Sequence, residues 1–277
     1  MQLRLADGFI DLSTPRVMGV LNVTPDSFSD GGRFVDFEAA FSQARRMAEE
    51  GAAIIDVGGE STRPGAVPVT AQAEIDRVVP VIEAIARSLD VAISVDTSKP
   101  EVMRAAVAAG ATIINDVYGL RRDGALEEAA RLEVAVCLMH MQGEPGTMQA
   151  DPRYDDVVGE VAGFLAGRVR ACREAGIAKD RMTIDPGFGF GKTDVHNVEL
   201  LANLRRFHEL ELPLTIGLSR KNTLGKLTGR AIDERVPAGL AAAVLAVERG
   251  AHIVRTHDVG PTVDAIQVAW AVMQHGA

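Results

Sequence analysis

Polar and charged side chains follow a series of short apolar runs in this sequence. They stand at or just after the end of each run, at Asn22, Asp56, Asp96-Thr97, Asn115-Asp116, His140, Asp185, Ser219-Arg220-Lys221 and Arg255-Thr256-His257-Asp258. Helix caps would account for Asp56, Asp116 and Asp258, because loops that enter helices often carry such residues. Caps do not account for Lys221, Arg255 and His257, whose charges disfavour a packed interior without a partner. The pattern therefore favours a ring of functional groups.

The types of these residues predict a ligand with two unlike parts. Basic side chains suit an anionic group such as a phosphate or a carboxylate, and these are Arg63, Lys221, Arg255 and His257. Asp96, Asn115 and Asp185 offer carboxylate and amide edges that match a flat polar heterocycle. Asn22 offers one oxygen, which is enough for a Mg²⁺ ion that keeps waters and substrate phosphates in its shell. We therefore expect a heterocycle deep in the fold and a phosphate nearer the rim.

The stretch from Asp185 to Thr193, DPGFGFGKT, is similar to two nucleotide-binding motifs without matching either. A P-loop would need glycine where Pro186 stands, and Gly-x-Gly-x-Gly is not the dinucleotide fingerprint. His140 and His257 do not have a zinc-ligand spacing on one helix face. Nucleotide and zinc sites are therefore disfavoured.

The apolar runs alternate with longer amphipathic segments along almost the whole chain. The runs are Val17–Leu21, Ile54–Val57, Ala92–Val95, Thr112–Ile114, Val134–Met139, Met182–Ile184, Leu214–Ile216 and Ile253–Val254. Their uniformly apolar character is typical of parallel strands that are covered on both faces. Eight such βα units predict a TIM (β/α)8 barrel, in which functional groups gather at the carboxyl ends of the strands. A doubly wound open sheet is the alternative.

Punctuation residues predict where the helices begin and end. Expected starts are Asp36 before Phe37–Glu50, Thr70 before Ala71–Leu89, Ser98 with Pro100, and Asn197 before Val198–Glu209. Expected stops are Gly51, Gly110 and Gly250, the last after Ala238–Arg249. The Asp-Gly pair between Leu3 and Leu12 predicts a β-hairpin that closes the N-terminal end of the barrel.

Length and composition predict one domain over residues 1–277. The chain is 47% hydrophobic, and its net charge of −9 argues against general nucleic-acid binding. Cys137 and Cys172 lack metal or redox spacing and are expected to be reduced packing residues. Since neither a signal peptide nor a membrane-spanning run is evident, we expect a cytoplasmic protein that binds no membrane.

Several of these stretches together resemble dihydropteroate synthases, in order, from about Val17 to Asp258. The motifs are NVTPDSFSDGG from Asn22, DVGGESTRPG from Asp56, SVDT from Ser94, INDV from Ile114, DPGFGFGK from Asp185, GLSRK from Gly217 and RTHD from Arg255. The resemblance implies a transferase of folate biosynthesis. In that reaction 4-aminobenzoate displaces diphosphate from 6-hydroxymethyl-7,8-dihydropterin diphosphate to give 7,8-dihydropteroate. It also implies a Mg²⁺ cofactor and a homodimer that is the target of sulfonamides.

The resemblance also assigns roles to individual residues. It implies that the pterin diphosphate is bound by Thr62, Asp96, Asn115, Met139, Asp185, Lys221, Arg255 and His257. It implies that 4-aminobenzoate is surrounded by Phe28, Thr62, Arg63, Pro64, Phe190, Lys221 and Ser219. Asn22 would contact the magnesium ion. The catalytic group would consist of Asp96, Asp185, Lys221, Arg255 and His257.

Chemical reasoning agrees with that assignment. Diphosphate leaves readily once its charge is neutralised, and the pterin can delocalise the positive charge, so we expect an SN1-like path. The aryl amine needs orientation and no catalytic triad.

Val23–Gly32 is interpreted as a lid in which Phe28 packs over the aminobenzoate ring. The alternatives are a corrinoid-linked methyltransferase and a pterin-binding barrel that has lost catalysis. The stretch around Trp270 predicts either a dimer interface or core packing.

Overall fold

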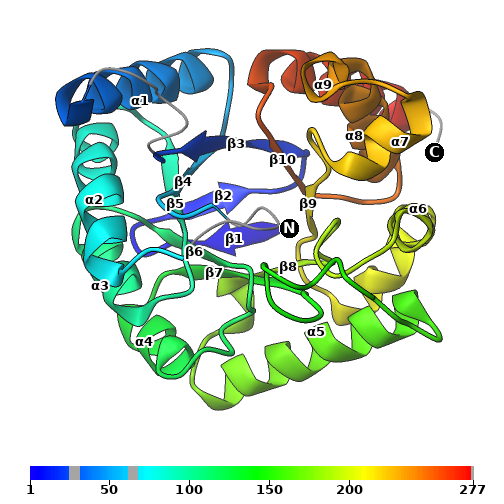
Figure 1. Cartoon of the computed structure of the whole chain (residues 1–277), viewed down its shortest axis with the longest axis horizontal. Helices are drawn as coiled ribbons and strands as arrows, with labels where there is room; N and C mark the ends of the chain where they lie inside the picture. The colour runs from blue at the N-terminus through cyan, green and yellow to red at the C-terminus, as the bar shows by residue number, and fades with distance from the viewer. Residues whose placement is uncertain (25–31, 62–67, 276–277) are drawn as a thin grey trace.

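The computed structural model describes residues 1–24, 32–61 and 68–275 and forms a ring of strands surrounded by helices (Figure 1). The ring consists of β3 (Arg16–Asn22), β4 (Ile54–Gly58), β5 (Ala92–Asp96), β6 (Ile113–Asp116), β7 (Ala135–Met139), β8 (Met182–Asp185), β9 (Thr215–Gly217) and β10 (Ile253–Thr256). These parallel strands pair in the order β8-β7-β6-β5-β4-β3-β10-β9. A bridge between Ile184 of β8 and Leu214, which precedes β9, joins the two ends of the sheet. The predicted barrel is therefore confirmed.

Helices follow the strands around the outside of the ring (Figure 1). They are α1 (Gly32–Glu49), α2 (Ala71–Ser88), α3 (Pro100–Ala108), α4 (Ala125–Leu132), α5 (Val157–Glu174), α6 (Asp194–Ala202), α7 (Asn222–Thr228), α8 (Val236–Glu248) and α9 (Val259–His275). Shorter 3-10 turns are η2 (Lys179–Arg181), η3 (Leu204–Leu210) and η4 (Ile232–Glu234). No helix in the described part of the chain is long and apolar enough to cross a membrane. Cys137 and Cys172 are buried and free, as expected.

Each strand of the ring lies where an apolar run predicts one, but several strands extend further towards the site. Asn22, Asp96 and Asp185 are the last residues of β3, β5 and β8, where the apolar pattern alone would end the strand earlier. These residues keep strand geometry because their neighbours pair with them through the backbone. Their side chains are therefore held by the sheet itself and do not depend on a loop for their position.

One helix start is right in detail and one is wrong. The Thr70 side chain accepts a hydrogen bond from the Ala73 amide and caps α2, as predicted. Asn197 does not begin a helix, because Thr193 caps α6 in a reciprocal arrangement with His196. Asn197 lies inside α6, and the region 198–209 divides into the end of α6 and the turn η3.

Three further expected caps are also wrong. Asp36 lies inside α1, which already begins at Gly32. The Ser98 hydroxyl donates to Asp116, so α3 starts at Pro100 without a side-chain cap. Asp116 is not a helix cap either, because it accepts the amides of Tyr118 and Leu120 and fixes the loop after β6.

The core has layers on both sides of the ring. A large apolar cluster fills the space between strands and helices, with Ile55, Val95 and Ile114 among its fully buried members. At the opposite end from the polar residues, the hairpin of β1 (Gln2–Arg4) and β2 (Phe9–Asp11) packs Leu3 and Ile10 against the first residues of the barrel strands. The hairpin thus closes the N-terminal end, as predicted. This leaves the carboxyl ends of the strands as the open end.

Candidate active site

Backbone register brings three of the predicted polar residues into one row at the open end. Asn22 of β3 pairs with Gly58 of β4, Gly58 with Asp96 of β5, and Asp96 with Asn115 of β6. Because Gly58 has no side chain, the space between Asn22 and Asp96 contains no group from β4 at this level. The row therefore presents an amide, a carboxylate and a second amide across four strands.

A buried network connects this row to the far side of the barrel. Arg255 of β10 donates from Nε to Oδ2 of Asp56 at 2.6 Å and from Nη2 to Oδ2 of Asp96 at 2.7 Å. The same Asp56 oxygen accepts from Nδ2 of Asn115 at 2.9 Å. Arg255, Asp96 and Asn115 are thus brought together as predicted, and Asp56 is the hub that holds them.

Asp56 is a site residue that its interpretation as a helix cap missed. It lies within β4 and is fully buried. A signal for its role is present in the sequence, because side chains alternate along a strand and Asp56 is two residues before Gly58. It must therefore face the same side of the sheet as the row of polar residues.

The charged groups of this network alter one another's pKa values. Burial raises the pKa of Asp96 to about 7, although Arg255 opposes the shift and Asp56 adds to it. For Arg255, burial disfavours the charge, but the Asp56 and Asp96 carboxylates outweigh burial and raise its pKa. Arg255 is therefore a permanent cation at the open end, while Asp96 changes its charge near neutral pH.

A second group lies on β8 and in the segment after β9. Asp185 accepts the Gly187 amide at Oδ1, 2.7 Å away, and burial raises its pKa. Lys221 places Nζ 4.2 Å from the centre of the Phe190 ring, a cation–π contact. Burial, with a contribution from Arg255, lowers the Lys221 pKa to about 8. A basic amine, a carboxylate and an aromatic face therefore converge here.

An apolar wall completes this end of the barrel. Its buried members form one cluster, made of Val117, Tyr118, Met139, Met141, Met148 and Phe190. Met139 and Asp185 are paired neighbours on β7 and β8, so the predicted thioether lies beside the predicted carboxylate. Flat heterocycles bind well between apolar side chains with a few polar groups at their edges.

His257 and Ser219 lie together where β10 and β9 end. Ser219 Oγ is 3.1 Å from Nδ1 of His257 and accepts the His257 amide at 3.2 Å. Burial and the nearby Arg255 lower the His257 pKa to about 3, so the imidazole is neutral in the free protein. Arg220 beside them forms an ion pair with Asp258 at 2.6 Å, which is why Asp258 is not simply a cap.

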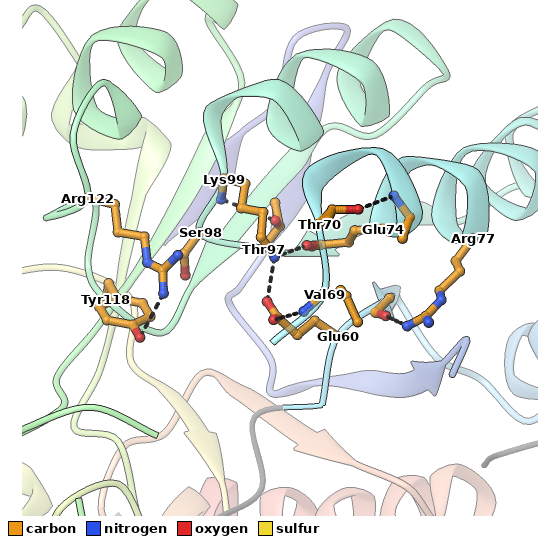
Figure 2. Close-up of polar contacts among 12 residues, drawn as sticks. Glu60, Val69, Thr70, Glu74, Arg77, Thr97, Ser98, Lys99, Tyr118 and Arg122 are labelled. Atoms are coloured by element: carbon orange, nitrogen blue, oxygen red, sulfur yellow. Dashed lines mark hydrogen bonds and ion pairs between the residues drawn. The ribbon is translucent and has the colours of Figure 1, made fainter. Parts of the chain in front are cut away.

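Glu60 joins the two ends of the segment that follows β4 (Figure 2). Its Oε1 accepts the Val69 amide at 2.9 Å, and its Oε2 forms an ion pair with Lys99 at 2.6 Å. Lys99 also forms an ion pair with Glu74, which is buried in α2. The chain is thus fixed where it leaves β4 and where it approaches α2. Thr62, Arg63 and Pro64 lie between these points, and they and Phe28 are outside the described residues.

Asn22 is the one residue proposed to contact a metal. The residues described contain no group of three His, Cys, Asp or Glu side chains that could hold a metal ion. A single neutral carboxamide oxygen is too weak a donor set for an ion bound by protein alone, but it suits Mg²⁺ that arrives with phosphate oxygens and water.

Comparisons with known proteins agree with this geometry. Residues 18–257 match the family described as pterin binding enzyme. The chain is 54% identical over 264 residues to the dihydropteroate synthase of Escherichia coli (strain K12), covering 95% of this chain and 94% of that protein.

Solved structures are equally similar. A Yersinia pestis dihydropteroate synthase with a sulfonamide drug complex has a TM-score of 0.94 at 50% identity, covering 99% of this chain and 100% of that one. The Xanthomonas albilineans enzyme matches with 4-aminobenzoic acid (TM-score 0.93, 53% identity, 100% and 99% coverage). It also matches in complex with 7,8-dihydropteroate (TM-score 0.91, 50% identity, 100% coverage of both chains). This chain belongs to the pterin-binding enzyme family and, within it, to the dihydropteroate synthases.

Proposed function

We propose that this chain condenses 6-hydroxymethyl-7,8-dihydropterin diphosphate with 4-aminobenzoate, forming 7,8-dihydropteroate and diphosphate. The observation that carries the proposal is Arg255, a cation held by Asp56 and Asp96 at the open end of a pterin-binding barrel. The carboxylate and amide groups around the site can hydrogen-bond a pterin ring, and the Arg255 cation can bind its diphosphate. A methyl-transfer barrel has no use for a diphosphate site, so the synthase reaction fits better.

The pterin is assigned to the deep part of the site. Asp96, Asn115 and Asp185 supply acceptors and an amide for its ring nitrogens and exocyclic groups, and Lys221 adds a donor. Met139 lies on the apolar wall and contacts the face of the ring. Supporting this depth, Asn115 and Asp185 are buried and are held in β6 and β8.

The diphosphate is assigned to the rim, where Arg255, His257 and Asn22 lie. Bound Mg²⁺ would be held by Asn22 and the substrate's oxygens, and it would neutralise charge on the leaving diphosphate. His257 is neutral before substrate binds, so it first acts as a hydrogen-bond donor. The negatively charged diphosphate nearby then favours its protonation.

The chemical step follows an SN1-like course. The bond between the exocyclic methylene carbon and the diphosphate oxygen breaks, and diphosphate keeps the electron pair. The positive charge spreads over the pterin, where the carboxylates of Asp96 and Asp185 stabilise it. The amine nitrogen of 4-aminobenzoate then bonds to the methylene carbon and loses one proton to solvent. The barrel supplies orientation and charge, and no covalent enzyme intermediate is formed.

The 4-aminobenzoate is assigned to the space above the pterin. Phe190 offers an aromatic face, and Lys221 and Ser219 offer polar contacts at its edge. The family resemblance adds Phe28, Thr62, Arg63 and Pro64.

Measuring diphosphate release with and without 4-aminobenzoate, and with and without Mg²⁺, tests the function. We expect dihydropteroate to form only with both substrates and release to depend on Mg²⁺. Methyl transfer to a corrinoid acceptor, with no dihydropteroate formed, would instead favour the methyltransferase alternative.

The 277 residues are proposed to form one pterin-binding domain that works in the cytoplasm as a homodimer. Supporting the dimer, seven of the nine large exposed hydrophobic side chains in the described residues lie on consecutive elements from α6 to α9. We refer to these seven residues together as the apolar patch; they are Val195, Val198, Leu227, Ile232, Leu245, Val268 and Val272. Trp270 packs against the core instead, so core packing is the better interpretation for that residue. The two free, buried cysteines fit a reducing compartment.

A further inference from the structure

Lys192 ends the glycine-rich stretch after β8, and its side chain is directed into the protein. It is only 2% exposed, although lysine is almost never fully buried unless it is paired. Its Nζ donates to the carbonyl oxygen of Gly187 at 2.9 Å and to that of Phe190 at 3.0 Å. The third contact is with Nδ1 of His140, 2.8 Å away. The lysine that gives this stretch its likeness to a P-loop therefore binds the loop's own backbone.

These contacts match what a buried ammonium group needs. A lysine has three N–H donors and no acceptor, and each of its three neighbours supplies one acceptor atom. Burial and the adjacent Lys192 lower the His140 pKa to about 3, which leaves the imidazole neutral and its Nδ1 able to accept. Burial also lowers the Lys192 pKa to about 7, while the Asp185 carboxylate favours its charge. The ammonium is thus fully bonded in a place where an unbonded one would be strongly disfavoured.

The bonded carbonyls belong to the loop that carries the aromatic face of the site. Phe190 lies under Nζ of Lys221, and its backbone is held by Lys192 and by a turn to Gly187. Asp185, by contrast, is a strand residue whose carbonyl accepts the His140 amide. The pterin side of the site is therefore held by the sheet, whereas Phe190 lies in a loop that side chains hold by its backbone. Asn197 binds the Gly189 amide, and Lys192 is the side chain that binds the carbonyl oxygen of Phe190 itself.

We propose that Lys192 is a positioning residue for 4-aminobenzoate, because it fixes the 187–191 loop so that the Phe190 ring faces Lys221. The proposal rests on the proposed function, since it takes Phe190 to be part of the aminobenzoate site. Lys192 itself touches neither substrate. Replacing Lys192 is therefore expected to weaken the binding of 4-aminobenzoate and to affect the binding of the pterin diphosphate much less.

Steady-state kinetics of Lys192→Met separate this role from a purely structural one. Methionine keeps a similar length and removes all three donors. We expect the KM for 4-aminobenzoate to rise at least about tenfold and the KM for the pterin diphosphate to change less than about threefold. Lys192→Gln keeps two N–H donors and should fall between wild type and Lys192→Met. Lys179→Met, which removes an exposed lysine paired with Glu211, is the control and should behave as wild type.

A second variant keeps the test decisive if Lys192→Met does not fold. His140→Leu removes the imidazole, including the Nδ1 acceptor, and leaves an apolar side chain beside Phe164. It should raise the 4-aminobenzoate KM in the same direction by a smaller factor. Equal increases for both substrates, or an unchanged 4-aminobenzoate KM in folded Lys192→Gln and His140→Leu, would overturn the positioning role. If wild-type protein makes no dihydropteroate, the proposed function itself fails, and that result is distinct from these.

Discussion

Arg255 is the residue on which the charge balance of the site depends. It shares its guanidinium between Asp56 and Asp96, so it neutralises part of the charge of two carboxylates that would otherwise face each other in a buried space. In the proposed site it is at the same time the permanent cation that an incoming diphosphate would meet. One side chain therefore links the pterin end of the site to its anion end.

Arg255→Ala should abolish diphosphate release while the protein stays folded. Loss of a preorganised charge at the leaving group is expected to lower kcat/KM by at least about 10²-fold. Asp96, whose pKa is already raised by burial, can take up a proton once Arg255 is gone, which limits the loss of stability. Circular dichroism checks folding, and Arg206→Ala, an exposed arginine paired with Glu209, is the matched control. Normal turnover by Arg255→Ala would refute the anion-site assignment.

The pH profile of kcat/KM for the pterin diphosphate should rise and then fall across neutral pH. Asp96, with its pKa raised to about 7, must be ionised to favour the pterin cation, so activity is lost as pH falls below about 7. Lys221, with its pKa lowered to about 8, must be protonated, so activity is lost above about 8. Each limb should approach about tenfold per pH unit. Asp96→Asn should move the acid limb away from 7, and a limb that stays in place would belong to another group.

Much of this site is predictable from residue type and place in the sequence, and two residues show where that ends. Arg255, Asp96 and Asn115 follow apolar runs and could be identified as facing one end. Asp56 also follows this pattern, but the sequence alone does not tell whether its carboxylate caps a helix or binds an arginine from β10. Lys192 likewise looks like a phosphate ligand. The Lys192 side chain instead points towards His140, the residue just after β7. The periodicity of the sequence does not predict that these two residues are close.

At the scale of elements, the loop from β8 to α6 shows how backbone geometry sets the site. Gly187 has a φ of +71°, and a β carbon there would overlap the carbonyl oxygen of His140. Gly191 has a φ of +62°, and a β carbon there would likewise overlap the carbonyl oxygen of Gln142. The loop therefore lies directly on the segment after β7. The proximity lets its carbonyls reach Lys192 and its Gly187 amide reach Asp185.

Gly187→Ala and Gly176→Ala form a matched pair that tests this packing. Both glycines have positive φ, but nothing lies within 4 Å of a β carbon at Gly176. Gly176→Ala should therefore lower the free energy of unfolding by about 1 kcal/mol, the left-handed penalty alone. Gly187→Ala adds a backbone clash and should lower it by about 3 kcal/mol or more, with loss of dihydropteroate formation. Urea denaturation measures both, and equal losses would contradict the close packing at Gly187.

Helix boundaries show why element positions are only partly predictable. Thr70 and Asn197 both have side chains that cap helices well, and only Thr70 does so. Thr193 caps α6 because it forms reciprocal hydrogen bonds with His196. The Asn197 side chain instead binds the Gly189 amide and the Thr223 hydroxyl. The choice of capping residue thus depends on tertiary partners that the local sequence does not reveal. The strands are easier to predict, because burial on both faces requires an apolar run whichever strands lie beside it.

At the scale of the whole molecule, the two sides of the barrel are unlike. Helices α6 to α9 carry the apolar patch and lie beside one another at the right of Figure 1. The other two large exposed hydrophobic residues in the described part, Met1 and Phe9, belong to the N-terminal hairpin region. An apolar patch of neighbouring residues on a water-exposed surface is typical of an association site. We therefore propose this side of the barrel as the face that a second copy of the chain would cover.

Replacing Val268 and Val272 together by aspartate should separate the proposed dimer. These side chains are 67% and 68% exposed in the single chain, so the monomer tolerates the change. In a dimer the carboxylates would be buried without partners, which should weaken association at least about hundredfold. Light scattering should give about twice the 29.4 kDa chain mass for wild type and the mass of one chain for the variant. Phe9→Asp, at a residue that is 61% exposed outside the patch, should remain dimeric. A wild-type mass of one chain, or a variant that stays dimeric, would exclude this face as the interface.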